Sequence, residues 1–222
     1  MTQPPPPDTG TLGALHQDPR LIADADAMAE AIAAVRRDGA ASVPVLSDHG
    51  RAWLRAAAAG LTFRVSRPVV GTGDKAVTQH FDICTAPPWD GPFGTGARLM
   101  SGLVNAGLAR MTEPPCGAIA FNEAVVQRYP PGPCGISPHR DHIRYTDLIG
   151  ILVIDGEGRF QLCDDRTGTN ARPVCAPPGS FLLMRAPGFD GSRHRPFHTL
   201  GAVTTERLIA GYRQDTRPGE PD

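Results

Sequence analysis

Apolar residues recur at helical spacing in the first half of the chain. Between residues 24 and 37, Met28, Ala31, Ile32 and Val35 fall on one helix face. Asp24 can cap this helix, and the Asp-Gly pair that follows can end it. The same reasoning predicts a strand at residues 41–46, a second helix that starts at Ser47 or Asp48 and reaches about residue 59, a strand near 61–65 and a third helix between 95 and 111.

After Pro114-Pro115 the pattern changes to short β-rich runs separated by Gly, Pro and Asp. No helix-length pattern separates these runs, which disfavours a parallel sheet with crossover helices. The sequence therefore predicts an α+β fold in which N-terminal helices precede a closed or two-sheet antiparallel β core at about residues 117–215. The expected strands occupy residues 118–129, 148–154, 160–163, 172–175, 180–185, 197–200 and 207–214.

The chain is predicted to contain one folded domain after a short leader. Residues 1–18 contain four consecutive prolines and little apolar periodicity, so we expect a polyproline-like or disordered leader before a single domain at 19–222. No apolar run approaches the roughly 20 residues of a membrane helix, and the first ten residues lack the pattern of a secretory signal. These features predict a cytoplasmic protein. Its five scattered cysteines are expected to stay reduced.

A candidate metal site appears at Pro138-His139-Arg140-Asp141-His142. In an extended segment, His139 and Asp141 point to the same side because the side-chain period is two. A second imidazole from far along the chain, His198 or His194, would complete two histidines and one carboxylate. This facial triad is typical of non-haem Fe(II) oxygenases. The HxD pattern alone is weak, since an exposed His beside an exposed Asp is common.

Other residues strengthen this interpretation. Arg207 lies nine residues after His198, and Arg213 lies six further on, so both guanidinium groups share one strand face. A buried arginine can bind a carboxylate through two parallel hydrogen bonds. Upstream, Gln127 and Tyr129 also share a face. Each placement alone fits an exposed charge or a half-buried aromatic, but together they indicate a site for an anionic ligand.

At these residues the sequence resembles the Fe(II)/2-oxoglutarate-dependent dioxygenases, and within them the AlkB-like branch. The resemblance covers about residues 122–215, a little under half of the chain. It implies a double-stranded β-helix core of the jelly-roll, cupin-like kind, with iron held by two histidines and one aspartate and with 2-oxoglutarate bound to that iron. The residues that carry the resemblance are Gln127 and Tyr129, His139 and Asp141, His198, and Arg207 and Arg213.

The resemblance also implies individual roles. His139, Asp141 and His198 would hold Fe(II). Arg207 would bind the distal carboxylate of 2-oxoglutarate, with help from Tyr129, Gln127 and Arg213. The distal histidine of the family opens a strand that precedes the arginine, which fits His198 better than the Arg-rich loop around His194. His142 has the opposite parity from His139 and Asp141, so it is expected to be a substrate contact at most.

Four residues are predicted to face the substrate. Arg140 and Arg144 flank the metal ligands on the side away from the iron, where a carboxylate or phosphate of the substrate can be held. His80 and Asp82 form a second HxD pattern without a matching arginine pair, and we expect them on a polar strand that faces the substrate. An ordinary exposed position remains the alternative for each.

The chemistry implied by the family narrows the function. Halogenases of this class have a small residue where this chain has Asp141, so hydroxylation or a related oxidation is favoured, with release of succinate and CO2. The chain has a net charge of −1, so it lacks the excess of basic residues that is typical of enzymes acting on nucleic acids. We therefore predict a small polar metabolite as substrate, and no nucleic acid or membrane partner. The alternatives are an AlkB-type demethylase of nucleic acid and a non-catalytic, metal-binding cupin-like module.

Overall fold

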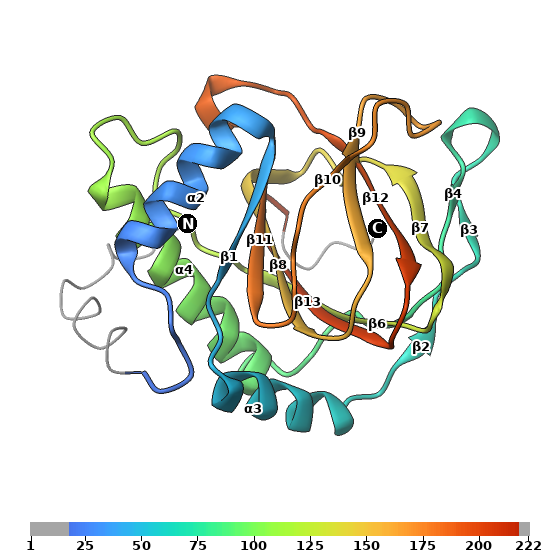
Figure 1. Cartoon of the computed structure of the whole chain (residues 1–222), viewed down its shortest axis with the longest axis horizontal. Coiled ribbons are helices and arrows are strands. Elements are labelled where there is room, and N and C mark those ends of the chain that lie inside the picture. The colour runs from blue at the N-terminus through green and yellow to red at the C-terminus, as the bar shows by residue number, and fades with distance from the viewer. Residues whose placement is uncertain (1–17, 218–222) are drawn as a thin grey trace.

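Antiparallel strands form the core of residues 18–217, the part of the chain that this computed structural model describes. Figure 1 shows two sheets that face each other, with helices α2 and α4 on one side of them. The helices are α2 (Ala25–Asp38), α3 (Asp48–Ala59) and α4 (Pro92–Arg110), and short 3-10 turns lie at Gly73–Lys75 and Phe189–Gly191.

The helices begin and end where their capping residues predict. The Asp24 side chain accepts a hydrogen bond of 2.9 Å from the backbone N–H of Ala27, and Ser47 caps α3 in the same way. Gly39 ends α2 with φ at 91°, a left-handed conformation that glycine adopts without a Cβ clash. The three predicted helices are therefore confirmed, with shifts of a few residues at their ends.

The larger sheet has the strand order β1-β11-β8-β13-β6-β5-β2, and the smaller sheet has the order β10-β9-β12-β7. From β6 to β13 the chain passes repeatedly between the two sheets, which is the winding of a double-stranded β-helix. This confirms the predicted α+β fold with a jelly-roll core. The strands are β1 (Ala40–Pro44), β2 (Arg64–Val65), β3 (Val69–Val70), β4 (Val77–Thr78), β5 (Asp82–Cys84), β6 (Glu123–Tyr129), β7 (Gly132–His139), β8 (Tyr145–Asp155), β9 (Arg159–Cys163), β10 (Arg172–Pro173), β11 (Ser180–Arg185), β12 (Phe197–Val203) and β13 (Arg207–Asp215).

Alternation along the strands separates two apolar cores. Tyr212, Phe181 and Leu152 point out of the larger sheet and pack with α2 and α4. Ile209 and Ile149 point the other way, into the space between the two sheets. Because side chains alternate, Arg207 and Arg213 share the inward face with Ile209. The β13 strand therefore places two arginines inside the barrel.

The structure corrects the expectation for residues 130–142. A polar turn was expected before β8, but Gly132–His139 forms β7, which pairs with β12. Gly132, Pro133, Gly135 and Pro138 hide this strand in the sequence because glycine and proline are depleted in strands. The β7–β12 register is irregular near His198 and Leu200. The short strands β3 and β4 were also not predicted, whereas the strand expected at His80 and Asp82 corresponds in part to β5, which begins at Asp82.

Two other predictions have different outcomes. The leader expected at residues 1–18 lies, apart from Asp18, outside the described residues, so its state remains a prediction. Among residues 18–217, no helix is long and apolar enough to cross a membrane. The described cysteines are all free, as expected.

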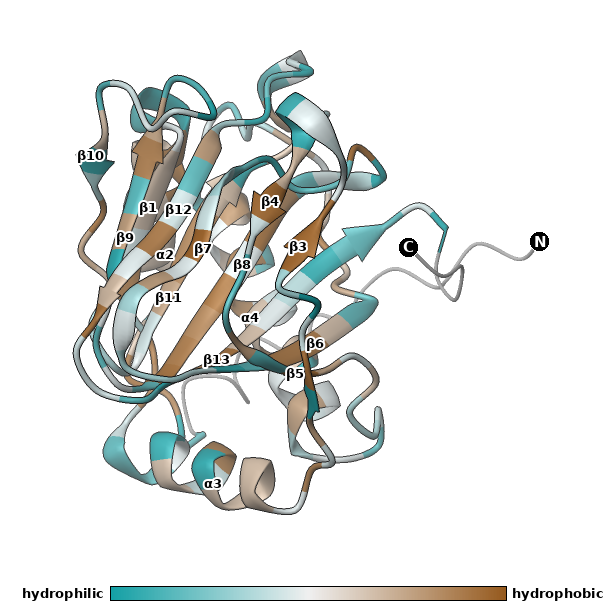
Figure 2. Ribbon diagram, turned by 90° about the vertical axis from the view of Figure 1, so that its right-hand side faces the viewer, coloured by the Kyte–Doolittle hydropathy of each residue, from teal (hydrophilic) through white to brown (hydrophobic). Residues whose placement is uncertain are grey.

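A two-stranded hairpin, β3–β4, stands beside the smaller sheet. Figure 2, which views the molecule from the side of this hairpin, shows apolar colour on both strands. Val69 and Val70 are about half exposed. The end of β4 is attached to β7 by a bridge between Gln79 and Ile136 and by a hydrogen bond of 3.0 Å from the Thr78 N–H to the Ser137 hydroxyl. The hairpin therefore has a fixed position at the edge of the barrel.

Candidate active site

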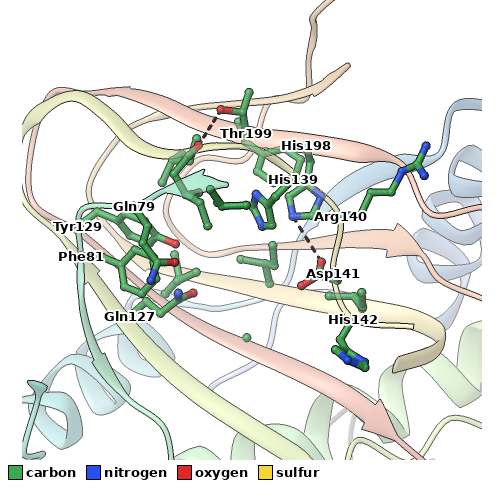
Figure 3. A pocket seen from close by; sticks show the side chains of 18 of the residues that line it. Gln79, Phe81, Gln127, Tyr129, His139, Arg140, Asp141, His142, His198 and Thr199 are labelled. Atoms are coloured by element: carbon green, nitrogen blue, oxygen red, sulfur yellow. Dashed lines mark hydrogen bonds and ion pairs between the residues drawn. The ribbon is translucent and has the colours of Figure 1, made fainter. Parts of the chain in front are cut away.

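Two histidines and one aspartate meet at the end of the smaller sheet. His139 ends β7, Asp141 follows two residues later, and His198 lies opposite His139 on β12. One ligand atom from each residue lies within 4.8 Å of the other two. The His198 Nε2 atom is 3.4 Å from Asp141 Oδ2, and Figure 3 shows the three side chains converging. The structure thus brings together the three predicted metal ligands.

The imidazole rings are oriented for metal binding. The Nδ1 atom of His139 lies 2.9 Å from the carbonyl oxygen of Ser137. Because a carbonyl only accepts hydrogen bonds, this contact places the proton on Nδ1 and leaves Nε2 with a free lone pair. The ring of His198 is held 4.2 Å from that of His139, measured between centroids, and stacks on Phe160 at 5.6 Å. Such support fixes both the tautomer and the direction of a ligand.

The protonation states also suit a cation. Burial and the neighbouring His198 lower the pKa of His139 to about 4, so its ring is neutral at pH 7. Burial acts to raise the pKa of Asp141, but His198, Arg213, His139 and Arg195 together outweigh it, so the pKa lies below its usual value. A neutral imidazole and an ionised carboxylate are the forms that bind a divalent metal.

A charged network supports Asp141 from behind. The guanidinium of Arg213 lies 3.9 Å from Asp141 Oδ1 and 3.8 Å from Glu123 Oε2. Tyr145 donates a hydrogen bond of 3.2 Å to the other oxygen of Glu123, and its ring lies 5.0 Å below the Arg213 guanidinium. Arg195 donates a hydrogen bond of 2.6 Å to the Asp141 carbonyl oxygen. Sequence reasoning missed Glu123 and Tyr145, because each acts through a contact that forms only in the folded chain.

Arg207 lies deeper in the barrel, six residues or about 20 Å along β13 from Arg213. It is only 2% exposed, and its position on β13 is directly opposite Tyr129 on β6. Its guanidinium reaches only the carbonyl oxygens of Gly156 and Ala176, at 3.4–3.5 Å, and it has no ion pair within residues 18–217. Burial lowers the pKa of Arg207 from its ordinary value. A buried cation without an acidic partner indicates a site for an anionic ligand.

Tyr129 and Gln127 lie beside Arg207 on the inward face of β6. Both are buried, and burial raises the pKa of Tyr129, so its phenol remains protonated. Neither side chain has a hydrogen-bond partner among the described residues, and both line the cavity. Their free donors are therefore available to a ligand next to Arg207.

A single cavity of about 400 Å³ joins the three parts of the site. Phe81, Ile136 and Phe160 belong to its apolar wall. A cavity of this size and mixed lining is typical of small-molecule sites. Its polar and charged lining comprises His139, Asp141 and His198, then Arg207, Tyr129 and Gln127, then Arg213, Arg140, His142, Gln79, Tyr145 and Thr199.

The predicted substrate residues divide into one that lines the cavity and three that do not. Arg140 lies at the cavity edge with its guanidinium 4.0 Å from the centre of the Phe197 ring. Arg144 is 7% exposed and forms an ion pair of 3.0 Å with the buried Asp215. The expectation for Arg144 as a substrate residue is therefore not supported, because the folded chain gives its charge an internal partner.

The segment that contains the second HxD pattern reaches the cavity, but the residues next to His80 and Asp82 face it instead of these two. Gln79 and Phe81 point into the cavity, as Figure 3 shows, while His80 is exposed. Asp82 forms an ion pair of 2.8 Å with Arg128. In a strand, neighbouring side chains point to opposite faces, so a placement in which Gln79 faces inward turns His80 outward. The sequence alone does not determine which alternate residues of this short segment face the cavity.

The two remaining histidines have different positions. His142 lines the cavity, and its Nδ1 atom accepts a hydrogen bond of 3.2 Å from the Arg144 N–H, so its role as a substrate contact stays a prediction. His194 is exposed in the loop before β12. It is not part of the metal-ligand group found among the described residues.

Comparisons with known proteins agree with this geometry at the level of the fold. No family model and no curated protein sequence matches the chain. A crystal structure from the 2OG-Fe(II) oxygenase family of Burkholderia pseudomallei is similar, with a TM-score of 0.59, 11% sequence identity, and coverage of 86% of this chain and 91% of that one. The chain has the fold of the 2-oxoglutarate and Fe(II) oxygenases.

Two further structures share this oxygenase fold. A Trichoplax adhaerens prolyl hydroxylase, solved with a peptide fragment of a hypoxia inducible factor, has a TM-score of 0.58 at 12% identity, with 94% of each chain covered. The structure of OsALKBH1 has a TM-score of 0.58 at 13% identity, covering 79% of this chain and 98% of that one. The oxygenase fold thus extends well beyond residues 122–215, where the sequence resemblance lies.

Proposed function

We propose that this chain is an Fe(II)- and 2-oxoglutarate-dependent oxygenase that oxidises a small polar metabolite. One observation carries the proposal. A buried arginine without an acidic partner among the described residues, Arg207, lines the same cavity as His139, Asp141 and His198. A metal-binding module without turnover has no use for this cation. An oxygenase that takes a dicarboxylate cosubstrate requires it.

The residues present fit both groups. His139, Asp141 and His198 offer the two imidazoles and one carboxylate that suit ferrous iron. When bound, the iron supplies the activation of oxygen that couples decarboxylation of 2-oxoglutarate to oxidation of the substrate. The chain's own residues then bind and orient the cosubstrate. Arg207 holds its distal carboxylate with charge-assisted hydrogen bonds, and Tyr129 donates its phenolic proton beside it.

Three groups keep the metal ligands in their active forms. His198 and Arg213 lower the pKa of Asp141 and so keep it ionised, and the Ser137 carbonyl keeps the proton of His139 on Nδ1. The apolar wall, which includes Phe160, lowers the local dielectric constant and so strengthens the interactions of Arg207 and Arg213 with anions.

The size and lining of the cavity support a small substrate. About 400 Å³ has to hold both the cosubstrate and the reacting part of the substrate, which leaves little room. Gln79 and His142 line the cavity and offer hydrogen-bond donors, while the exposed Arg140 lies at its edge with the guanidinium against Phe197. A net charge of −1 does not supply the many phosphate contacts that nucleic-acid binding needs.

Succinate formation tests the proposal. Purified protein is incubated in air with Fe(II), 2-oxoglutarate and a reductant, and succinate is measured with and without pools of small metabolites. We expect iron-dependent succinate that rises with the pool containing the substrate. Salt-sensitive stimulation by methylated oligonucleotides, with formaldehyde release, would instead indicate a nucleic-acid demethylase. Absence of iron-dependent succinate under all conditions would favour the non-catalytic cupin-like module.

A further inference from the structure

A second cavity lies behind Arg207. It has a volume of about 340 Å³ and is formed by the segments 156–160 and 173–178 together with Arg207. Arg207 and Phe160 line this back cavity and also the main cavity. These two side chains are therefore the partition between the two spaces. The end of the main cavity that holds the distal carboxylate is closed by side chains that have free volume behind them.

The partition at Arg207 is weakly held. Its three contacts to the carbonyl oxygens of Gly156 and Ala176 are 3.4–3.5 Å long, beyond the usual range for such hydrogen bonds. No acidic side chain within residues 18–217 forms an ion pair with it. Beside its aliphatic stem lies Gly158, where a Cβ would come within 3.3 Å of the Arg207 Cδ atom. The guanidinium can therefore retreat into the back cavity without breaking a strong interaction.

We propose that the cosubstrate site also accepts 2-oxo diacids one methylene longer than 2-oxoglutarate, of which 2-oxoadipate is the simplest. This inference rests on the proposed function. The extra methylene displaces the distal carboxylate by at most one C–C bond, about 1.5 Å. Arg207 follows the carboxylate by moving into the back cavity, so the two hydrogen bonds between its guanidinium and the carboxylate are kept. A pocket closed by a tightly held arginine would instead leave the longer acid with a clash or an unpaired carboxylate.

The reaction with the longer acid balances in the same way. One oxygen atom of O2 enters the substrate, and the other enters the carboxylate formed when 2-oxoadipate loses its first carbon as CO2. The products are the oxidised substrate, glutarate and CO2. No further oxidant is needed, because oxidation of the 2-oxo acid supplies two electrons and the substrate supplies two.

Binding is measured by calorimetric titration of Mn(II)-loaded protein with 2-oxoglutarate and with 2-oxoadipate, without turnover. We expect the two dissociation constants to lie within about tenfold of each other, a difference of at most about 1.4 kcal/mol. With Fe(II) in air, glutarate should form from 2-oxoadipate. A dissociation constant for 2-oxoadipate more than about a hundredfold above that of 2-oxoglutarate would overturn the inference.

Two variants test the role of the back cavity. Val174 lines the back cavity but not the main one, so Val174→Phe should fill the space into which Arg207 retreats. This variant should raise the dissociation constant for 2-oxoadipate by about tenfold or more, while the dissociation constant for 2-oxoglutarate should change by less than about threefold. Val174→Ala is the matched control and should leave both acids unchanged. If Val174→Phe does not fold, Val174→Met serves the same purpose, because it adds less bulk to the same back cavity.

The outcomes separate the two proposals. Tight binding and turnover of 2-oxoglutarate with rejection of 2-oxoadipate would overturn the inference alone. Equal losses for both acids in Val174→Phe would also overturn it, since the back cavity would then have no selective role. Failure of both acids to bind the metal-loaded protein would contradict the proposed function itself.

Discussion

Replacing Arg207 by methionine should remove 2-oxoglutarate binding while leaving the fold intact. Methionine keeps most of the length of the side chain and fills the same buried space without a charge. In the structure Arg207 is 2% exposed and lines the cavity, and its only hydrogen bonds within residues 18–217 are three at 3.4–3.5 Å. The substitution is therefore expected to have a large effect on 2-oxoglutarate binding and a small effect on the free energy of unfolding.

The magnitude follows from the partners on each side of Arg207. A bidentate, buried carboxylate interaction costs about 3 kcal/mol to truncate, because the ligand's charge is left unpaired in a desolvated pocket. Since about 1.4 kcal/mol corresponds to tenfold, the dissociation constant for 2-oxoglutarate should rise by roughly a hundredfold or more. Without ligand, the arginine is a desolvated charge, as its lowered pKa shows. Its replacement by an apolar side chain should leave the free energy of unfolding within about 1 kcal/mol or raise it.

The assay combines a titration and a melt. The dissociation constant for 2-oxoglutarate is measured calorimetrically on Mn(II)-loaded protein, and the midpoint of thermal unfolding is measured without ligand. Arg128→Met is the matched control, because Arg128 lies on β6 next to Gln127 and Tyr129 but pairs with Asp82 outside the cavity. The control should bind 2-oxoglutarate normally. An unchanged dissociation constant in Arg207→Met would refute the assignment of the carboxylate site.

Three further predictions concern the metal ligands and the ion pair behind them. His198→Ala should lose Fe(II) binding in a metal analysis, while His194→Ala should keep it, and the reverse result would show that the distal ligand is wrongly chosen. Arg144→Met leaves Asp215 charged and buried, so it should lower the free energy of unfolding by about 3 kcal/mol in a denaturant titration without changing the 2-oxoglutarate dissociation constant, and an effect on the cosubstrate alone would contradict this. The pKa of His139 in the folded, metal-free protein is about 4, so between pH 7 and pH 5 the unfolded chain gains a proton at this residue and the folded protein does not. The free energy of unfolding should therefore fall by about 2 kcal/mol over this range. A His139→Gln variant should lack this fall, and equal pH slopes in the two proteins would count against the prediction.

The parts of the site that the sequence predicts are those set by local spacing. His139 and Asp141 are two residues apart, and Arg207 and Arg213 are six apart, so each pair shares a face of one extended segment whatever the rest of the chain does. His198 does not follow from local spacing, and the resemblance to the oxygenase family is what favours it over His194. The spacing of apolar residues likewise predicted the helices and most long strands, because apolar periodicity reports which face is buried.

The parts that the sequence does not predict depend on partners far along the chain. Arg144 was assigned to the substrate because its partner Asp215 lies 71 residues away in sequence and meets it only in the fold. The parity of Gln79 and His80 is set by a single bridge to Ile136, which no local pattern reveals. Strand β7 was missed for a related reason, since pairing with β12 overrides the low strand propensity of its glycines and prolines.

The central claim is that an iron ion and 2-oxoglutarate meet in the cavity that His198 and Arg207 line. An anaerobic titration tests this most directly, because a 2-oxo acid that chelates Fe(II) produces a visible absorption band. We predict that the Fe(II)-loaded protein develops this band with 2-oxoglutarate, that His198→Ala does not, and that Arg207→Met requires roughly a hundredfold more 2-oxoglutarate. Absence of the band in the unaltered protein, or an equal band in His198→Ala, would contradict the account.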